Sequence, residues 1–180
     1  MNYVPDWSPA LYDDVESVVA DFYDQLSSIV NRALEHVWVI WNPLSNQRFS
    51  DGPVILGFDN QQLEMAGRDH RLAISWNTIN VSRDPEALLI WDQSDMSEPT
   101  EIIDLYWRDN PDMFDEGMIG STLTKLCVVS DRPYSLRIDF SLDNGLVFAV
   151  YNYQDSTGVS KVTWKDDPLR KKSKCFEHST

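Results

Sequence analysis

Residues 136–152 read "LRIDFSLDNGLVFAVYN", and this stretch predicts two antiparallel strands joined by a tight turn. Apolar and polar residues alternate before the turn, as in a strand that buries one face, and the apolar residues are Leu136, Ile138, Phe140 and Leu142. Asn144 and Gly145 supply the positive φ that a short hairpin loop requires. With a loop of residues 143–145, three pairs should face each other: Leu142 with Leu146, Phe140 with Phe148, and Ile138 with Val150.

Residues 53–76, "PVILGFDNQQLEMAGRDHRLAISW", predict a meander of three more strands, at 54–58, 62–66 and 71–76. The aromatic and β-branched run at 36–42 and the later run at 158–164 predict one strand each. The stretches "LGFDNQQLEM" and "FSLDNGLVFA" both place Asp-Asn at a turn between strands. We interpret this likeness as two hairpins under the same physical constraints, with an old duplication as the alternative.

An N-terminal amphipathic helix is predicted over residues 9–36. Apolar residues recur there at three- and four-residue steps: Leu11, Val15, Val18, Phe22, Leu26, Ile29 and Ala33. Ser8 is suited to cap the helix and Pro9 to open it. The predicted fold class is α+β, with this long helix packed on a mostly antiparallel sheet built from meanders and hairpins. Its core should bury Phe22 together with Phe140.

The chain of 180 residues has the size of one domain, which we place at 1–166. Residues 167–180 lack a hydrophobic period and carry four bases, so we expect a flexible, basic, polar tail outside the core. Cys127 lies in an apolar run and is expected to be buried, whereas Cys175 lies in the tail and is expected to be a free thiol. We expect a cytoplasmic protein, because reduced cysteines fit that compartment and neither a signal peptide nor a membrane-spanning run is recognisable.

The net charge of −14 is unevenly distributed. Residues 1–120 contain 22 acids and 6 bases, a balance of −16, whereas residues 121–180 contain 7 acids and 9 bases, a balance of +2. Negative charge of this size repels nucleic acid and anionic lipid, so we expect neither as a direct ligand. It favours a basic protein partner, and solubility alone is the alternative explanation.

The acidic stretch 96–117 contains seven carboxylates with a Tyr-Trp pair among them. Ser97 is suited to cap a short helix that contains Pro99, Glu101 and Ile102 and ends by residue 110. We predict a partner-binding surface here, in which charges steer encounter and aromatic rings anchor the complex. It consists of Asp92, Asp95, Glu98, Glu101, Asp104, Tyr106, Trp107, Asp109, Asp112, Asp115 and Glu116. The alternative is that the aromatic residues fill the core beneath an ordinary solvated loop.

Catalytic and metal sites have little support in the sequence. Asp69-His70 is the one dyad candidate, but neighbouring turn residues seldom point the same way, and no nucleophile elbow, phosphate loop or zinc motif is present. Asp109, Asp112 and Asp115 fall three apart, but an EF-hand loop needs glycine at its sixth position, where Phe114 stands. We therefore expect no catalytic residue, no metal and no cofactor, although carboxylate pairs formed in space leave no sequence pattern.

The segments "ILGFDNQQLEM" and "LRIDFSLDNGLVFAVYN", in an acidic α+β chain, resemble immunity proteins of bacterial polymorphic-toxin and contact-dependent inhibition systems. The resemblance covers about a sixth of the chain and implies an inhibitor that binds a cognate toxin, often a nuclease with a basic cleft. It implies no particular functional residue, because these proteins share none. We expect a monomer or weak homodimer that covers the toxin's active site. The alternatives are a nucleic-acid mimic that inhibits a DNA-binding protein and a small carboxylate-dependent enzyme.

Overall fold

The computed structural model describes residues 3–92, 95–110, 117–132, 135–153, 156–162 and 172–177. Within these ranges the chain forms one helix and fourteen strands, and every strand pairing is antiparallel. The fold is therefore α+β and consists mostly of sheet, as predicted. No helix in the described ranges is long and apolar enough to cross a membrane.

The first sheet contains seven strands in the order β1-β6-β5-β4-β2-β3, with β9 pairing along β2. Their bounds are β1 Ala10–Tyr12, β2 His36–Asn42, β3 Gln47–Arg48, β4 Val54–Phe58, β5 Gln61–Arg68, β6 Arg71–Trp76 and β9 Tyr106–Asp109. The predicted strands at 36–42, 54–58 and 71–76 have these bounds, and β5 is longer than the predicted 62–66. The predicted meander is thus confirmed.

The second sheet contains five strands in the order β13-β12-β11-β10-β14. Their bounds are β10 Leu123–Arg132, β11 Ser135–Leu142, β12 Val147–Tyr153, β13 Ser156–Lys161 and β14 Lys172–Glu177. The β11–β12 hairpin has the predicted register, with Phe140 opposite Phe148 and Ile138 opposite Val150. The Leu142 amide donates to the Leu146 carbonyl over 2.9 Å, and Gly145 has φ +83°.

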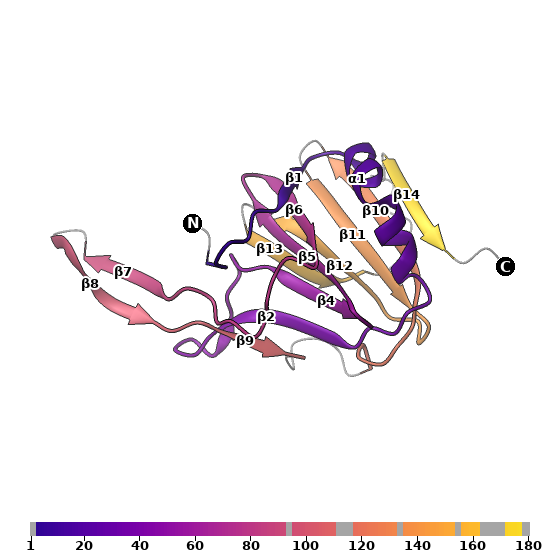
Figure 1. The fold of residues 1–180 in the computed structure, drawn as a ribbon. Coiled ribbons are helices and arrows are strands. Elements are labelled where there is room, and N and C mark those ends of the chain that lie inside the picture. The colour runs from indigo at the N-terminus through magenta and orange to yellow at the C-terminus, as the bar shows by residue number, and fades with distance from the viewer. Residues whose placement is uncertain are drawn as a thin grey trace.

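The two sheets and the helix enclose one hydrophobic core. Figure 1 shows β5 and β6 of the first sheet lying against β11 and β12 of the second. Side chains from both sheets are fully buried between them, among them Leu56, Met65, Ile138 and Phe140. A second cluster covers the other face of the first sheet, where Val4 and Trp7 of the N-terminal segment pack near Ile40, Ile55 and Ile103.

Thr157 of β13 joins the two sheets. Its hydroxyl donates to the Gly52 carbonyl over 2.8 Å and accepts from the Gly67 amide over 3.1 Å. A Cβ atom on Gly67 would lie 2.1 Å from the Ser156 carbonyl oxygen, so only glycine permits this approach. Since Thr157 is 1% exposed, these bonds are shielded from water and fix how the sheets meet.

The helix α1, Val15–Ile29, is shorter at both ends than the predicted 9–36. Asp14 rather than Ser8 caps it, accepting from the Ser17 amide over 2.8 Å. Residues Ala10–Tyr12 instead pair with β6, and Asn31 leaves the helix with φ +69°. Pairing with a sheet edge satisfies backbone groups as fully as a helix does, so an apolar stripe alone does not fix helix ends.

Phe22 departs from the prediction of full burial. It is half-buried, its backbone is non-helical (φ −124°, ψ 16°), and its ring meets Tyr12 edge-on at 5.9 Å. Leu26 and Ile29, one and two turns later, are fully buried in the core that contains Phe140. The helix thus contributes Val15 and Val18 from its first half and Leu26 and Ile29 from its second half to the core, while Phe22 packs at the edge of that core.

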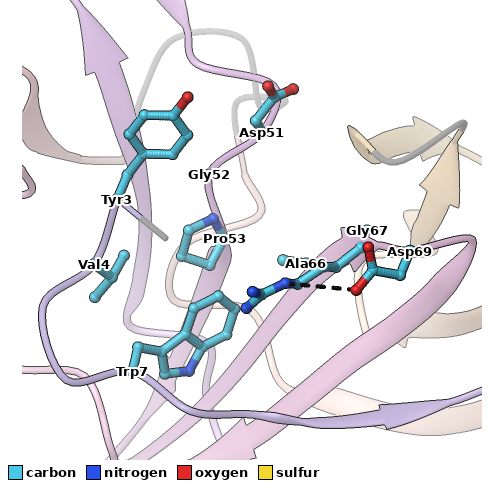
Figure 2. A pocket seen from close by; sticks show the side chains of 10 residues that line it. Tyr3, Val4, Trp7, Asp51, Gly52, Pro53, Ala66, Gly67 and Asp69 are labelled. Carbon is cyan, nitrogen blue, oxygen red and sulfur yellow. Dashed lines mark ion pairs between the residues drawn. The ribbon is translucent and has the colours of Figure 1, made fainter. Parts of the chain in front are cut away.

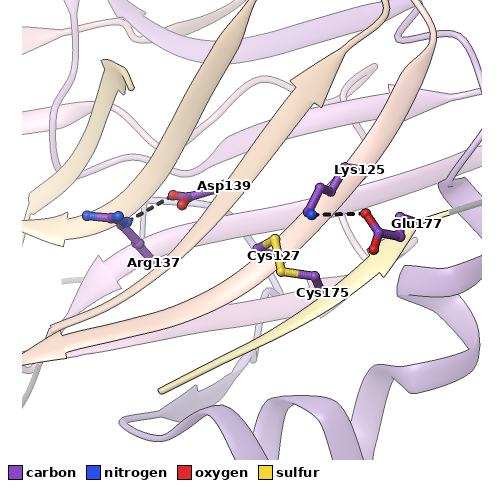
Figure 3. The surroundings of a disulfide bond; sticks show 6 residues. All are labelled: Lys125, Cys127, Arg137, Asp139, Cys175 and Glu177. Carbon is purple, nitrogen blue, oxygen red and sulfur yellow. Dashed lines mark hydrogen bonds and ion pairs between the residues drawn. A yellow bond between two sulfur atoms is a disulfide. The ribbon is translucent and has the colours of Figure 1, made fainter. Parts of the chain in front are cut away.

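Residues 172–177 overturn the prediction of a tail outside the core. They form β14, which pairs with β10, and Phe176 is 6% exposed within the main core. Cys175 forms a disulfide with Cys127 (Figure 3), so the expected free thiol is also wrong. The strand escaped prediction because Phe176 alone supplies its buried face. Residues 167–171 and 178–180 of the predicted tail lie outside the described residues.

Candidate partner-binding surface

A two-stranded hairpin projects from the body of the molecule (Figure 1). It consists of β7, Leu88–Asp92, and β8, Asp95–Ile103. The prediction of a helix starting near Ser97 is therefore wrong. Isoleucine and threonine fit an extended chain better than a helix, and Pro99 sits where the β7–β8 register shifts, a place where proline is tolerated in strands.

The root of the hairpin is fixed to the first sheet. Ile103 and Leu105 are 5% and 3% exposed and belong to the cluster on the sheet's outer face. The chain then continues directly into β9, where Ile40 pairs with Trp107. Because its root is buried, the hairpin is held in a defined direction while its strands extend into solvent.

Apolar side chains are exposed on the hairpin. Leu89 and Ile102 pair across the two strands and are 39% and 60% exposed, so they form one apolar face. Ile90, 39% exposed, alternates to the opposite face, where it pairs with Glu101. With Tyr106 of β9, these residues make up four of the eight large hydrophobic side chains that are exposed in the described part of the chain. We call Leu89, Ile90, Ile102 and Tyr106 the apolar set.

The predicted carboxylates follow the same hairpin and strand. Glu101 and Asp104 are exposed, and Asp109 at the end of β9 contacts the His36 ring, with 2.7 Å between Oδ2 and Nδ1. Asp92, Asp95 and Glu98 lie on β7 and β8, where the structure defines the backbone but not their side chains. Asp112, Asp115 and Glu116 lie outside the described residues. The acids that the structure places thus accompany the apolar set.

The two predicted aromatic anchors differ in exposure. Tyr106 is 39% exposed, as an anchor should be. Trp107 is half-buried against the outer cluster, and its Nε1 donates to the Arg83 carbonyl over 3.0 Å. Trp107 therefore stabilises the fold as well as bordering the surface. Sequence reasoning missed Leu89, Ile90 and Ile102 as surface residues, although "ALLIW" lacks the polar alternation of a half-buried strand.

A cleft of about 250 Å³ lies on the same side of the first sheet as the N-terminal segment (Figure 2). It is lined by Tyr3, Trp7, Asp51 and residues 66–69 at the end of β5, where Arg68 Nε lies 3.9 Å from Asp69 Oδ2. Burial, and to a lesser degree the Asp51 charge, raises the pKa of the Tyr3 phenol. The titratable residues that line the cleft are Tyr3, Asp51, Arg68 and Asp69.

Glu64 is a fully buried carboxylate, the kind of group that often marks catalysis. It accepts from the amides of Thr78 and Ile79, each over 2.7 Å, and from the hydroxyls of Ser75 and Thr78. Ser75 in turn accepts from Trp7 Nε1 over 2.6 Å. All four acceptor positions of the carboxylate are thus used, so Glu64 fixes the chain that leads toward the hairpin.

Among the described residues, no group of three or more His, Cys, Asp or Glu side chains converges to hold a metal ion. No protein-family model, curated protein or solved structure matches the chain. We therefore infer what the chain does from the shape, exposure and charge of its own residues.

Proposed function

We propose that this chain is a binding protein for a basic protein partner and that the β7–β8 hairpin and β9 form its interface. The observation that carries the proposal is the apolar set on a projecting, rooted hairpin with carboxylates beside it. Leu89 and Ile102, paired across the two strands, form one exposed apolar face, and an exposed apolar face bordered by charge is typical of protein interaction sites.

The two kinds of residue would have separate roles in the complex. Full burial of an exposed leucine or isoleucine side chain contributes about 1.5–3 kcal/mol. Leu89 and Ile102 are 39% and 60% exposed, so each would gain roughly half of that on binding and act as an anchor of the complex. Glu101 and Asp104 would raise the rate of encounter with a basic surface. The surplus of 16 negative charges in residues 1–120 acts in the same direction.

In its specific form, the proposal is that the partner is a toxin with a basic substrate cleft, such as a nuclease, and that the chain is its immunity protein. The nine residues of β8 extend about 30 Å at ~3.3 Å per residue, so such a hairpin suits a concave target. The resemblance of the chain's hairpins to those of immunity proteins supports this form. A cytoplasmic location also belongs to the proposal, but the cysteines no longer support it, because a disulfide is the form favoured in oxidising compartments.

The interface is tested by binding between the purified chain and basic toxin domains encoded next to its gene, measured by calorimetry. Replacing Leu89 and Ile102 by serine should weaken binding by at least about 100-fold, because two anchors are lost. Tyr153→Ser, at a residue that is 61% exposed on β12 of the other sheet, is the matched control and should bind normally. Undiminished binding by the Leu89→Ser, Ile102→Ser variant would overturn the assignment of the interface.

A further inference from the structure

β14 is attached to the edge of the second sheet by a covalent bond. Cys127 of β10 and Cys175 of β14 stand directly opposite each other, with Cα atoms 4.1 Å apart and a disulfide between them (Figure 3). The two cysteines are 48 residues apart in the chain. β14 is an outer strand of its sheet, so one of its edges is unpaired in the described part of the chain.

Besides its backbone pairing with β10, β14 makes few side-chain contacts within the described part of the chain. Lys125–Glu177 and Lys172–Glu16 are ion pairs of 2.9 and 3.1 Å whose side chains are all at least 36% exposed, and such pairs contribute little. Phe176 is the one fully buried side chain of the strand, and its ring lies 5.3 Å from that of Tyr23 on α1. A six-residue edge strand with one core residue is only marginally stable on its sheet without further attachment.

The two cysteines of the disulfide differ in solvent exposure. Cys127 is fully buried in β10, between β11 and β14. Cys175 is partly exposed on the outer strand. A reductant therefore reaches the disulfide from the β14 side.

We propose that the Cys127–Cys175 disulfide is a redox latch that holds β14 on the sheet and releases it when reduced by a dithiol. The thiolate of the dithiol attacks Cys175 Sγ, the disulfide bond breaks, and Cys127 Sγ leaves as a thiolate that takes up a proton. The second thiol of the dithiol attacks the mixed disulfide, so Cys175 leaves as a thiol. Two electrons and two protons pass to the protein, and the dithiol becomes a cyclic disulfide.

Release of β14 has a defined structural consequence. It frees the backbone groups of residues 125–130 in β10 that now pair with residues 172–177. It also uncovers the side of α1 at Tyr23, where Phe176 now packs. The β7–β8 hairpin lies on the other side of the molecule (Figure 1), so the latch acts on a separate surface from the proposed interface.

Hydrogen–deuterium exchange of the purified oxidised chain, with and without dithiothreitol, tests the latch. After reduction, exchange should rise at least about tenfold at residues 172–177 and at those amides of residues 125–130 that point to β14 rather than to β11, because their opening no longer requires breaking a covalent bond. Residues 138–150 of the β11–β12 hairpin should remain protected. Trypsin cleavage after Lys174, slow in the oxidised chain, should become fast.

The matched variant is Cys175→Ser, which changes only the partly exposed partner and leaves the buried Cys127 in place. Without reductant it should show the exchange of the reduced chain, and dithiothreitol should have no further effect. Unchanged exchange at 172–177 in a chain with two titratable thiols would overturn the proposal. So would a general loss of protection that includes residues 138–150, because the disulfide would then hold the whole fold rather than one strand.

Discussion

Single polar residues determine how the elements of this chain are joined. Glu64 receives four hydrogen bonds from the 75–79 segment, and Thr157 of the second sheet bonds to Gly67 of β5 and to Gly52 just before β4 in the first. Both are buried, where an unsatisfied partner would cost about 1–3 kcal/mol. Neither role can be predicted from sequence. The donors to Glu64 include residues of a loop, and the hydrogen-bond partners of Thr157, Gly52 and Gly67, lie 90 or more residues away in the chain.

Asp14, the cap of α1, makes helix stability depend on pH. Hydrogen bonds from the Ser17 hydroxyl and amide lower the pKa of the Asp14 carboxyl below its usual value. A lowered folded-state pKa means that the charged cap stabilises the fold above the unfolded pKa and ceases to do so as pH falls through the folded pKa. Asp14→Ala should therefore be less stable than the wild type at pH 7, and the difference should shrink below about pH 4. Urea unfolding at several pH values checks this, and a difference that grows in acid would contradict it.

At the scale of elements, local patterns predicted the strands well and the longer features less well. The hairpin at Asn144-Gly145 was predictable to the register because turn chemistry and period-two alternation agree there. The ends of α1 could not be predicted in this way, since Leu11 fits both an apolar helical stripe and the β1 strand that pairs with β6. The β7–β8 hairpin was mistaken for a helix because Ser97 resembles a helix cap. The strand β14 was mistaken for a tail because only a long-range disulfide and the burial of Phe176 attach it to the fold. The apolar part of the candidate surface was missed for the same reason, since it depends on the hairpin.

Two large apolar side chains of the helix, Phe22 and Leu26, should contribute differently to stability because they differ in burial. Leu26 is fully buried, so Leu26→Ala should lower the free energy of unfolding by about 2–5 kcal/mol through lost contacts and a cavity. Phe22 is half-buried at a non-helical position, so Phe22→Ala should cost less than Leu26→Ala although its side chain is larger. Urea unfolding of both variants measures the difference. An equal or larger loss for Phe22→Ala would show that the half-buried ring of Phe22 supports the core as strongly as the fully buried Leu26 side chain does.

At the scale of the whole molecule, the net charge and the placement of its acids have different consequences. A charge of −14 attracts any basic protein at long range and is screened beyond about 8–10 Å at physiological salt. Acids that border an interface act at shorter range and also orient the encounter. The position of Glu101 and Asp104 at the hairpin, rather than the total charge, should therefore control association.

Charge reversal at matched positions separates these two effects. The variant Glu101→Lys, Asp104→Lys and the control Asp13→Lys, Asp24→Lys change the net charge equally, and all four residues are exposed. Folding should be unaffected in both, because exposed charges contribute only about 0–1 kcal/mol each. At low salt, the association rate constant with the basic partner, measured by stopped flow, should fall about tenfold or more for the hairpin variant and only slightly for the control. The rate constants of the two variants should converge as the salt concentration rises. Equal slowing would mean that the carboxylates act only through the overall field of the protein and that the hairpin binds through its apolar residues alone.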